Sequence, residues 1–140
     1  MKRKEGVKKR ARGRAPTGRR TANQLLGAAA EQVAVDFLRA QGLEILDRNF
    51  RRRLGELDII ARDGDVLVIA EVRARSSDQF GGAAASVGFG KQARLIRAAA
   101  QLLQQRRELA RLRVRFDVLA ISKVGGHPTH VDWIRHAFST

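Results

Sequence analysis

The sequence predicts an α/β domain in which a central mixed sheet is flanked by helices. Two observations support this fold class: apolar residues recur at helical spacing in two segments, and apolar runs typical of strands lie between and after them. The resulting order is helix, three strands, helix and then one or two strands, or α-β-β-β-α-β-β. At 140 residues, the chain suits one domain with a substantial core better than two.

A first helix is predicted from about residue 23 to Gln41. Gly42 follows directly and is expected to end it, because glycine is favoured just past helix ends. The apolar stripe of this helix consists of Leu25, Leu26, Ala29, Val33, Phe37 and Leu38. Such a stripe predicts a helix that covers one face of the sheet.

Three strands are predicted next, over residues 43–50, 55–61 and 66–70. The pair Asp63-Gly64 lies between the second and third strands and is a strong signal for a tight hairpin turn. Residues 66–70 are continuously apolar, which is typical of a strand covered on both faces. We therefore expect this third strand at the centre of the sheet.

The second half of the chain predicts one more helix and further strands. The helix is expected from Lys91 to about Glu108, with an apolar stripe on one side and an Arg- and Gln-rich surface on the other. A strand is then expected over residues 114–121 and a last short strand around 131–134. Gly125-Gly126 is expected to form the turn between them.

The chain is strongly basic, with a formal charge of +14 at pH 7 and a pI of about 11.7. This excess is larger than solubility requires, so a polyanionic partner is expected, nucleic acid before a membrane surface. Much of the charge lies in residues 1–22, which hold ten Lys or Arg residues against the single acid Glu5.

Residues 1–22 are predicted to form a disordered basic arm, and residues 23–140 a single domain. The arm has almost no apolar residue larger than Val7, and Pro16 and several glycines interrupt any helix, so it cannot bury enough surface to fold alone. We expect the arm to follow phosphates without sequence specificity. A solubilising tail is the alternative.

The sequence contains no cysteine, which excludes disulfides and thiolate metal sites and suits the reducing cytoplasm. No segment approaches the about 20 apolar residues of a membrane-spanning helix, and the basic N-terminus is not followed by the apolar core of a signal peptide. A cytoplasmic protein that is neither secreted nor membrane-bound is therefore expected.

The predicted hairpin brings acidic residues together. If Asp63-Gly64 forms the centre of its turn, Glu56 faces Glu71, and Asp58 lies diagonally across the strand pair from Glu71. Glu56, Asp58 and Glu71 then share one face of the sheet, and Arg73 follows on that face. Asp58 and Glu71 are close enough in this arrangement for both carboxylates to reach one ion.

Two explanations of the acidic face stay open on spacing alone. Like charges that face each other destabilise a sheet, and a divalent cation would remove the conflict. Mg²⁺ or Mn²⁺ would suit the site, because hard cations bind carboxylate oxygens, main-chain carbonyls and water. The alternative is a solvated hairpin end, where Glu71 pairs with Arg73 or Arg75 and Asp58 with an arginine of the run 51–53.

Glu31 is a third acid of interest. Its neighbours one turn away on the first helix are Gly27, Ala28, Ala34 and Val35, and none of them carries a positive charge. A carboxylate in such surroundings usually finds a partner elsewhere in the fold, so Glu31 could point toward the hairpin. The alternative is a lone acid at the boundary of the helix.

These residues also carry a resemblance to a known family. The segment Gly55-Glu56-Leu57-Asp58-Ile59-Ile60 followed by Glu71-Val72-Arg73-Ala74-Arg75 resembles the YraN family of bacterial proteins. The other residues that carry the resemblance are Glu31, Ala34, Lys91, Arg115, Phe116 and Asp117. The family is similar to archaeal Holliday-junction resolvases and other nucleases of the PD-(D/E)XK type. The resemblance, which covers residues 23–122, implies a restriction-endonuclease-like fold.

The resemblance also implies roles for individual residues. Asp58 matches the metal-binding aspartate of the family, Glu71 the acid of its Glu-x-Lys element, and Glu31 the helix glutamate that completes the metal site. Lys91 matches a lysine at the start of the second helix that would bind phosphate. Such a site would use Mg²⁺ or Mn²⁺ to activate a water that attacks a phosphodiester in duplex or branched DNA.

One position departs from the family pattern: Arg73 stands where the family has the lysine of Glu-x-Lys. An arginine can hold a phosphate and stabilise negative charge, but its pKa is too high for proton transfer. The catalytic set would then be Asp58, Glu71 and Arg73. The hypotheses are a nuclease, with Lys91 or Arg75 as a substitute for the lysine, and a module that binds nucleic acid without cutting it.

Six basic residues are candidates for nucleic-acid binding: Arg51, Arg52, Arg53, Arg75, Lys91 and Arg94, with Glu56 as a secondary acid beside them. Aromatic residues make up only 5% of the chain, so stacking on single strands has little support and duplex or branched nucleic acid is favoured. The resemblance to nucleases implies DNA before RNA. A zinc site at His127, His130 and His136 is not expected. Trp133 is expected to pack on the last strand. A homodimer is suggested only by analogy with the family.

Overall fold

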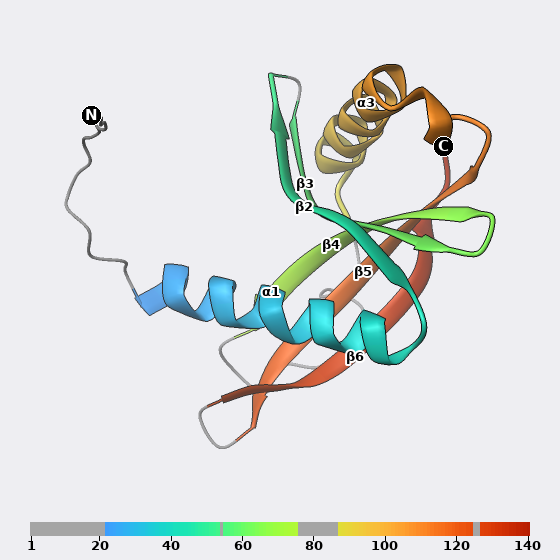
Figure 1. Ribbon diagram of the computed structural model, residues 1–140. Coiled ribbons are helices and arrows are strands. Elements are labelled where there is room, and N and C mark those ends of the chain that lie inside the picture. Colours follow the sequence, from blue (N-terminus) through green and yellow to red (C-terminus); the bar gives the residue numbers. More distant parts are fainter. Residues whose placement is uncertain (1–21, 54, 76–86, 125–126) are drawn as a thin grey trace, which may run out of the picture.

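The structure is a computed structural model, and it describes residues 22–53, 55–75, 87–124 and 127–140. Figure 1 shows the order α-β-β-β-α-β-β, which confirms the predicted fold class. The elements are α1 (Ala22–Ala40), β2 (Glu44–Arg52), β3 (Gly55–Asp63), β4 (Val66–Arg75), α3 (Phe89–Gln105), the 3₁₀ turn η3 (Arg107–Leu109), β5 (Arg113–Val124) and β6 (His127–Phe138). The predicted arm lies outside the described residues except for Ala22, which begins α1.

Helix α1 ends where the sequence predicts. Gly42 has a φ of 93°, a left-handed conformation that glycine adopts without steric cost. The N–H of Gly42 donates to the carbonyl of Arg39 at 3.0 Å, and the N–H of Leu43 donates to that of Leu38 at 3.0 Å. This pair of bonds is the Schellman motif, which satisfies carbonyls at the helix end.

The five strands form one mixed sheet in the order β2-β3-β4-β5-β6. Strands β4 and β5 are parallel, and the other neighbouring pairs are antiparallel. Residues 67–70 of β4 are buried, and the strand lies between β3 and β5, which confirms its predicted central place. The parallel pair places the C-terminal ends of β4 and β5 at the same edge of the sheet.

The register of the β3–β4 hairpin differs from the prediction. Asp63 pairs with Val66, so the two central residues of the turn are Gly64 and Asp65. Gly64 has a φ of 62° and occupies the first central position, where a type II′ turn requires glycine. The predicted register, with Glu56 opposite Glu71, is therefore wrong. The observed register continues toward Asp58 opposite Glu71.

Several element lengths also differ from the prediction. Strand β4 continues to Arg75, and β6 is a twelve-residue strand that pairs along β5. The expected short strand around 131–134 is only its middle. Helix α3 begins at Phe89, two residues before Lys91, and ends at Gln105, where η3 replaces the last expected turn. Strand pairing lengthens β4 and β6 beyond what local apolarity indicates.

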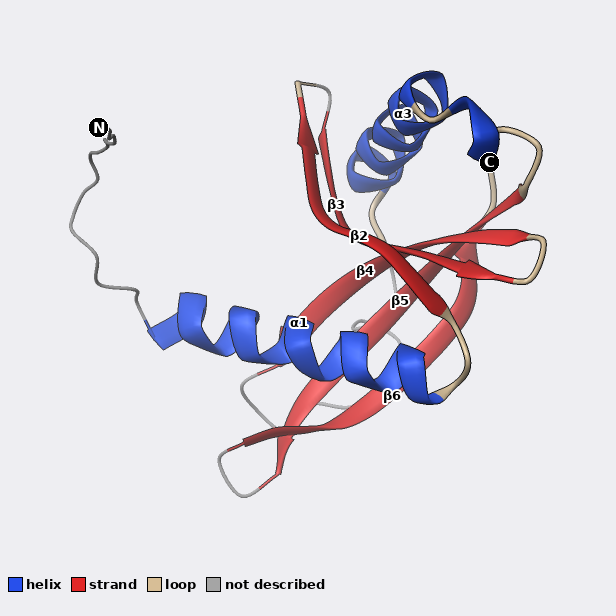
Figure 2. Cartoon of the chain, in the orientation of Figure 1, coloured by secondary structure: helices blue, strands red, loops and turns tan. Residues whose placement is uncertain are grey.

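The two helices lie on different faces of the sheet, as Figure 2 shows. Helix α3 packs into a core with residues of β3, while α1 packs into a second core on the other face. The first core includes Leu57, Ile60, Leu67, Ile69, Leu95 and Leu102, and the second includes Val35, Leu38, Ile59, Val68, Leu119 and Ile121. None of the described helices is long and apolar enough to cross a membrane.

Candidate functional site

Asp58 lies where β3 separates from β4. The backbone pairs of these strands end at Ile59–Ala70, and Asp58 follows as the next residue toward the start of β3. Its Oδ2 accepts the backbone N–H of Val72 on β4 at 2.9 Å. The side-chain carboxylate of Asp58 therefore takes the place of a backbone carbonyl as the acceptor of the next hydrogen bond between β3 and β4. This contact holds the side chain beside β4.

Glu71 is the second acid of the pair and is 9% exposed in the centre of the sheet. Burial, followed by the charge of the Glu71 carboxylate, raises the pKa of Asp58 from 3.8 to about 7. The N–H of Val72 and the charge of Lys91 oppose this rise but do not cancel it. The hairpin therefore holds two adjacent carboxylates, as the sequence predicts, although in a different register.

Lys91 supplies the counter-ion. Its Nζ lies 3.1 Å from Oε2 of Glu71, and the two side chains are 35% and 11% exposed. Lys91 is in the first turn of α3, so this ion pair joins the helix to the centre of the sheet. Arg73 lies two residues further along β4 and is half-buried. The side chain of Arg75 lies outside the described residues.

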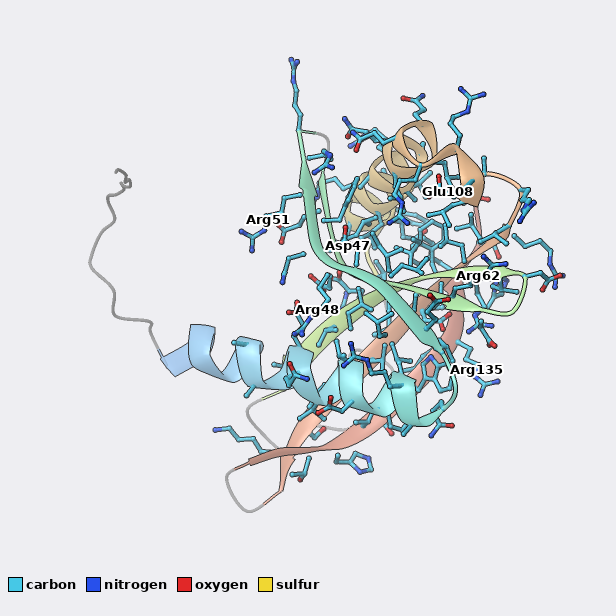
Figure 3. All side chains as sticks on the ribbon, viewed as in Figure 1. Asp47, Arg48, Arg51, Arg62, Glu108 and Arg135 are labelled. Carbon is cyan, nitrogen blue, oxygen red and sulfur yellow. The ribbon has the colours of Figure 1, made fainter. Side chains whose placement is uncertain are left out.

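Glu31 makes its contacts with β2. Its Oε1 accepts hydrogen bonds from Nη2 of Arg48 and Nδ2 of Asn49, both at 3.1 Å, and Arg48 is labelled beside α1 in Figure 3. Asn49 falls between the pairs Arg48–Ile59 and Phe50–Leu57 and so faces Asp58. Glu31 thus contacts the residue that aligns with Asp58 across β2 and β3. The structure does not bring it into contact with the acidic pair.

The metal site implied by the resemblance is therefore only partly assembled. Asp58 and Glu71 are adjacent, while the carboxylate of Glu31 is engaged by Arg48 and Asn49. Within the described ranges, no group of three or more His, Cys, Asp or Glu side chains is arranged to hold a metal ion. Two carboxylates are available to a cation at this position, and Glu31 would have to exchange its present partners to become a third.

Glu56 does not join the acidic face. It pairs with Arg51 across β2 and β3, and its Oε2 lies 3.5 Å from Nε of Arg51. Both side chains are exposed. Figure 3 shows Arg51 on the side of the hairpin away from α3. The expectation that Glu56 lies directly opposite Glu71 is wrong, because the observed register continues toward Asp58 opposite Glu71.

Four of the predicted nucleic-acid-binding residues gather at one pocket. The pocket has a volume of about 360 Å³ and lies between the end of the β2–β3 hairpin and the first half of α3. Its lining residues are Arg52, Arg53, Gly55, Glu56, Lys91, Arg94 and Leu95. Lys91 belongs both to this pocket and to the ion pair with Glu71, so the basic pocket and the acidic pair adjoin each other.

A buried network around Asp117, which pairs with Ala70 on the neighbouring strand, was not predicted from spacing. Asp117, which is 1% exposed, accepts hydrogen bonds from Arg115, Trp133 and the backbone of His136. Trp133 also contacts Phe37 of α1 edge to face, with ring centroids 5.7 Å apart. This contact confirms that Trp133 packs the last strand, β6, against α1. The signal in the sequence was a lone acid inside an apolar strand, two residues after an arginine.

The comparisons with known proteins cover the residues of this site. The model of the uncharacterised protein family UPF0102 matches residues 30–121, a range that contains both acids, Lys91 and the basic pocket. A UPF0102 protein of Bordetella avium is 53% identical over 112 residues, covering 80% of this chain and 73% of its own.

Two further relatives match at similar coverage. A UPF0102 protein of Alkalilimnicola ehrlichii is 48% identical over 81% of this chain and 86% of its own. One of Pseudomonas savastanoi pv. phaseolicola is 42% identical over 86% of this chain and 98% of its own. These matches confirm the family indicated by the sequence motifs, since UPF0102 is the YraN family. The chain belongs to the uncharacterised protein family UPF0102.

Proposed function

We propose that this protein is a divalent-metal-dependent endonuclease that hydrolyses phosphodiesters in duplex or branched DNA. The observation that carries the proposal is the pair of the half-buried Asp58 and the buried Glu71, which adjoins a basic pocket through Lys91. Acids that would bind a cation and bases that would bind a phosphate thus lie side by side. The restriction-endonuclease-like character of the fold belongs to this proposal.

The acidic pair fits Mg²⁺ or Mn²⁺. Two adjacent buried carboxylates are costly while both are charged, as the raised pKa of Asp58 indicates. Mg²⁺ is commonly bound through one or two carboxylates and keeps several waters, so Asp58 and Glu71 suffice as protein ligands. When bound, such an ion activates a water and stabilises charge on phosphate oxygens. Glu31 would be a further ligand if it exchanges Arg48 for the ion.

The basic residues around the pair would act on the substrate. Lys91 neutralises Glu71 at 3.1 Å, and a cation bound at the pair would take over this role. The ammonium would then be available to a phosphate oxygen, since Lys91 also lines the pocket. Arg73, on the same strand as Glu71, would stabilise negative charge without transferring a proton.

A second candidate function is a nucleic-acid-binding module without nuclease activity. The observation that favours it is Arg73, which replaces the lysine of the family pattern. A module of this kind keeps the basic pocket and binds nucleic acid, DNA or RNA, in a salt-sensitive manner. It would lack turnover because no group at position 73 can exchange a proton near neutral pH.

Cleavage of a panel of duplex, nicked and branched DNAs in Mg²⁺ or Mn²⁺ tests the first function. We expect cleavage by the wild type and a loss of at least about 100-fold in Asp58→Ala, because removing even an outer-shell partner of a metal ligand costs about 10–100-fold. Asp65→Ala, which removes an exposed acid of the same hairpin, is the matched control. Indistinguishable cleavage by wild type and Asp58→Ala would refute the assigned site.

Arg73→Lys separates the two functions. If the site is a weakened enzyme, restoring the lysine should raise the cleavage rate by about 100-fold or more, the lower end of what a positioned acid-base group contributes. Tight, salt-sensitive binding with no cleavage in either protein would favour the binding module. The measurement is single-turnover cleavage, with the affinity for the same DNA determined in Ca²⁺.

A further inference from the structure

Asp58 lies at an irregular point of β3, between its two neighbouring strands. The backbone pairs with β4 stop one residue away, at Ile59–Ala70. The pairs with β2 leave out Asp58 together with the residue that faces it, Asn49, and both residues lie in the described part of the chain. The regular ladder is therefore interrupted on both sides of Asp58.

Strand β3 also turns over at this residue. Leu57 and Ile60 belong to the core under α3, whereas Ile59 belongs to the core under α1. Residues two apart in a regular strand point to the same face, so the strand is turned between Leu57 and Ile59. Figure 1 shows the outer half of the β2–β3 hairpin bending away from the rest of the sheet. Irregularities of this kind re-aim a side chain, and here that side chain is Asp58.

Asn49 is the residue at which β2 departs from the extended conformation. Its φ is 54°, which lies in the left-handed region and interrupts the backbone of a strand. Asparagine is one of the few residues besides glycine that adopt this region readily. The interruption opposite Asp58 therefore depends on the residue at position 49.

Helix α1 holds Asn49 through a cluster of side chains. Oε1 of Glu31 accepts Nδ2 of Asn49 and Nη2 of Arg48, both at 3.1 Å. Nη1 of Arg48 donates to Oε1 of Gln32, also at 3.1 Å. The Glu31 side chain is only 16% exposed, and hydrogen bonds are stronger where water is largely excluded. Two consecutive residues of β2 are thus attached to one turn of α1.

We propose that Asn49 is a positioning residue for Asp58, and that Glu31 serves the acidic pair through Asn49 and not as a ligand of the ion. Glu31 connects α1 to Asn49 and keeps its present partners. The left-handed turn at Asn49 leaves the facing Asp58 unpaired with β2, so its carboxylate can accept the N–H of Val72 at 2.9 Å. That Asp58 binds an ion rests on the proposed function, whereas its placement by Asn49 does not.

Amide hydrogen exchange in the absence of metal tests this placement. The N–H of Val72 reports its contact with Asp58, and Ala70 reports the regular β3–β4 ladder on the same strand. Asn49→Ala should lower the protection of Val72 relative to Ala70 by about 10-fold, because alanine disfavours the left-handed region. Asn49→Gly, which adopts that region freely, should recover about 3-fold or more of this loss.

Two variants of α1 complete the exchange test. Glu31→Ala, which leaves residue 49 unchanged, should lower the relative protection of Val72 by about 3-fold or more, and it provides the test if Asn49→Ala does not fold. Gln32→Ala is the matched control, because it removes a neighbouring hydrogen bond of the same cluster, and it should change the protection by less than about 2-fold. Unchanged Val72 protection in Asn49→Ala or Glu31→Ala, or equal losses at Val72 and Ala70, would overturn the proposal.

Binding of Mn²⁺, followed by electron paramagnetic resonance, separates the two roles of Glu31. Glu31→Gln keeps an oxygen that can accept Asn49 and Arg48, so the Mn²⁺ affinity should stay within about 3-fold of wild type. Asp58→Asn should lower this affinity by about 10-fold or more. An equal loss in Glu31→Gln would make Glu31 a ligand and overturn the proposal. If Mn²⁺ does not bind at the acidic pair, the nuclease proposal fails, and the exchange measurements still decide how Asp58 is placed.

Discussion

Asp117→Ala is expected to lower the free energy of unfolding by about 3–5 kcal/mol, because it removes the hydrogen-bonded partner of the mostly buried Arg115 guanidinium, which would keep only a 4.0 Å contact with Asp63. The Asp117 side chain is 0% exposed. Its two oxygens accept Nε and Nη2 of Arg115 and Nε1 of Trp133, each at 2.9 Å, and the N–H of His136 at 3.0 Å. Four donors would lose their acceptor in the variant, and two of them belong to a guanidinium that stays charged.

The position of Asp117 explains why its loss should be so large. The β5–β6 register shifts between Phe116 and Val118, and His136 on β6 has a φ of 53°. Asp117 lies at this irregularity, and its carboxylate accepts the backbone N–H of His136. The side chain thus takes the place of a backbone carbonyl of the neighbouring strand. The carboxylate therefore sets the register of β6 as well as neutralising Arg115.

Urea unfolding measures this loss, with Asp65→Ala as the matched control. Asp65 also pairs with an arginine, Arg113, at 3.5 Å, but both side chains are largely exposed, at 80% and 77%. An exposed pair contributes about 0–1 kcal/mol, so the control should unfold near the wild-type midpoint. If both variants lose the same stability, the Asp117 network does not hold β5 and β6 together.

Asp58→Asn is expected to stabilise the protein at pH 8 by an amount on the order of 4 kcal/mol at most. The pKa of Asp58 rises from 3.8 to about 7 through burial and the charge of Glu71. At pH values between these two pKa values, Asp58 keeps its proton in the folded protein but has released it in the unfolded chain. The stability of the wild type therefore falls as the pH rises through this window, and the full cost is present above about pH 7.

An asparagine at position 58 removes this cost while it keeps the local hydrogen bonds. Its carbonyl oxygen can accept the N–H of Val72, and its amide can donate to Glu71. Unfolding of both proteins at pH 4 and pH 8 is the measurement, and the advantage of the variant should be small at pH 4 and large at pH 8. Asp65→Asn is the control, with no pH-dependent gain. A constant difference between Asp58→Asn and wild type would contradict the raised pKa.

The order of the elements was predictable because it depends on local signals. Helical spacing, the glycine at position 42 and the continuous apolar run 66–70 each act over a few residues, and each prediction is confirmed. The hairpin register was not, because Asp63-Gly64 fits two turn centres. The choice depends on which residue takes the left-handed conformation, and Gly64 takes it as the first central residue.

The acidic pair was predictable because Asp58 and Glu71 lie on neighbouring strands and share a face of the sheet in both the predicted and the observed register. The partners of the acids were not. Glu71 pairs with Lys91 from α3, and Glu31 pairs with Arg48 seventeen residues away. The contact between Arg52 and Gln105 spans 53 residues. Such pairs depend on how helices pack on the sheet, which spacing along one element does not encode.

Diffraction from crystals soaked in Mn²⁺ at pH 8 tests the central claim, that Asp58 and Glu71 together bind a divalent cation. The claim predicts an anomalous peak within about 2.0–2.6 Å of a carboxylate oxygen of each residue, with Lys91 moved from its position 3.1 Å from Glu71. Crystals of Asp58→Asn should lack that peak. An intact Lys91–Glu71 pair with no peak beside it, in crystals that bind Mn²⁺ elsewhere, would contradict the claim.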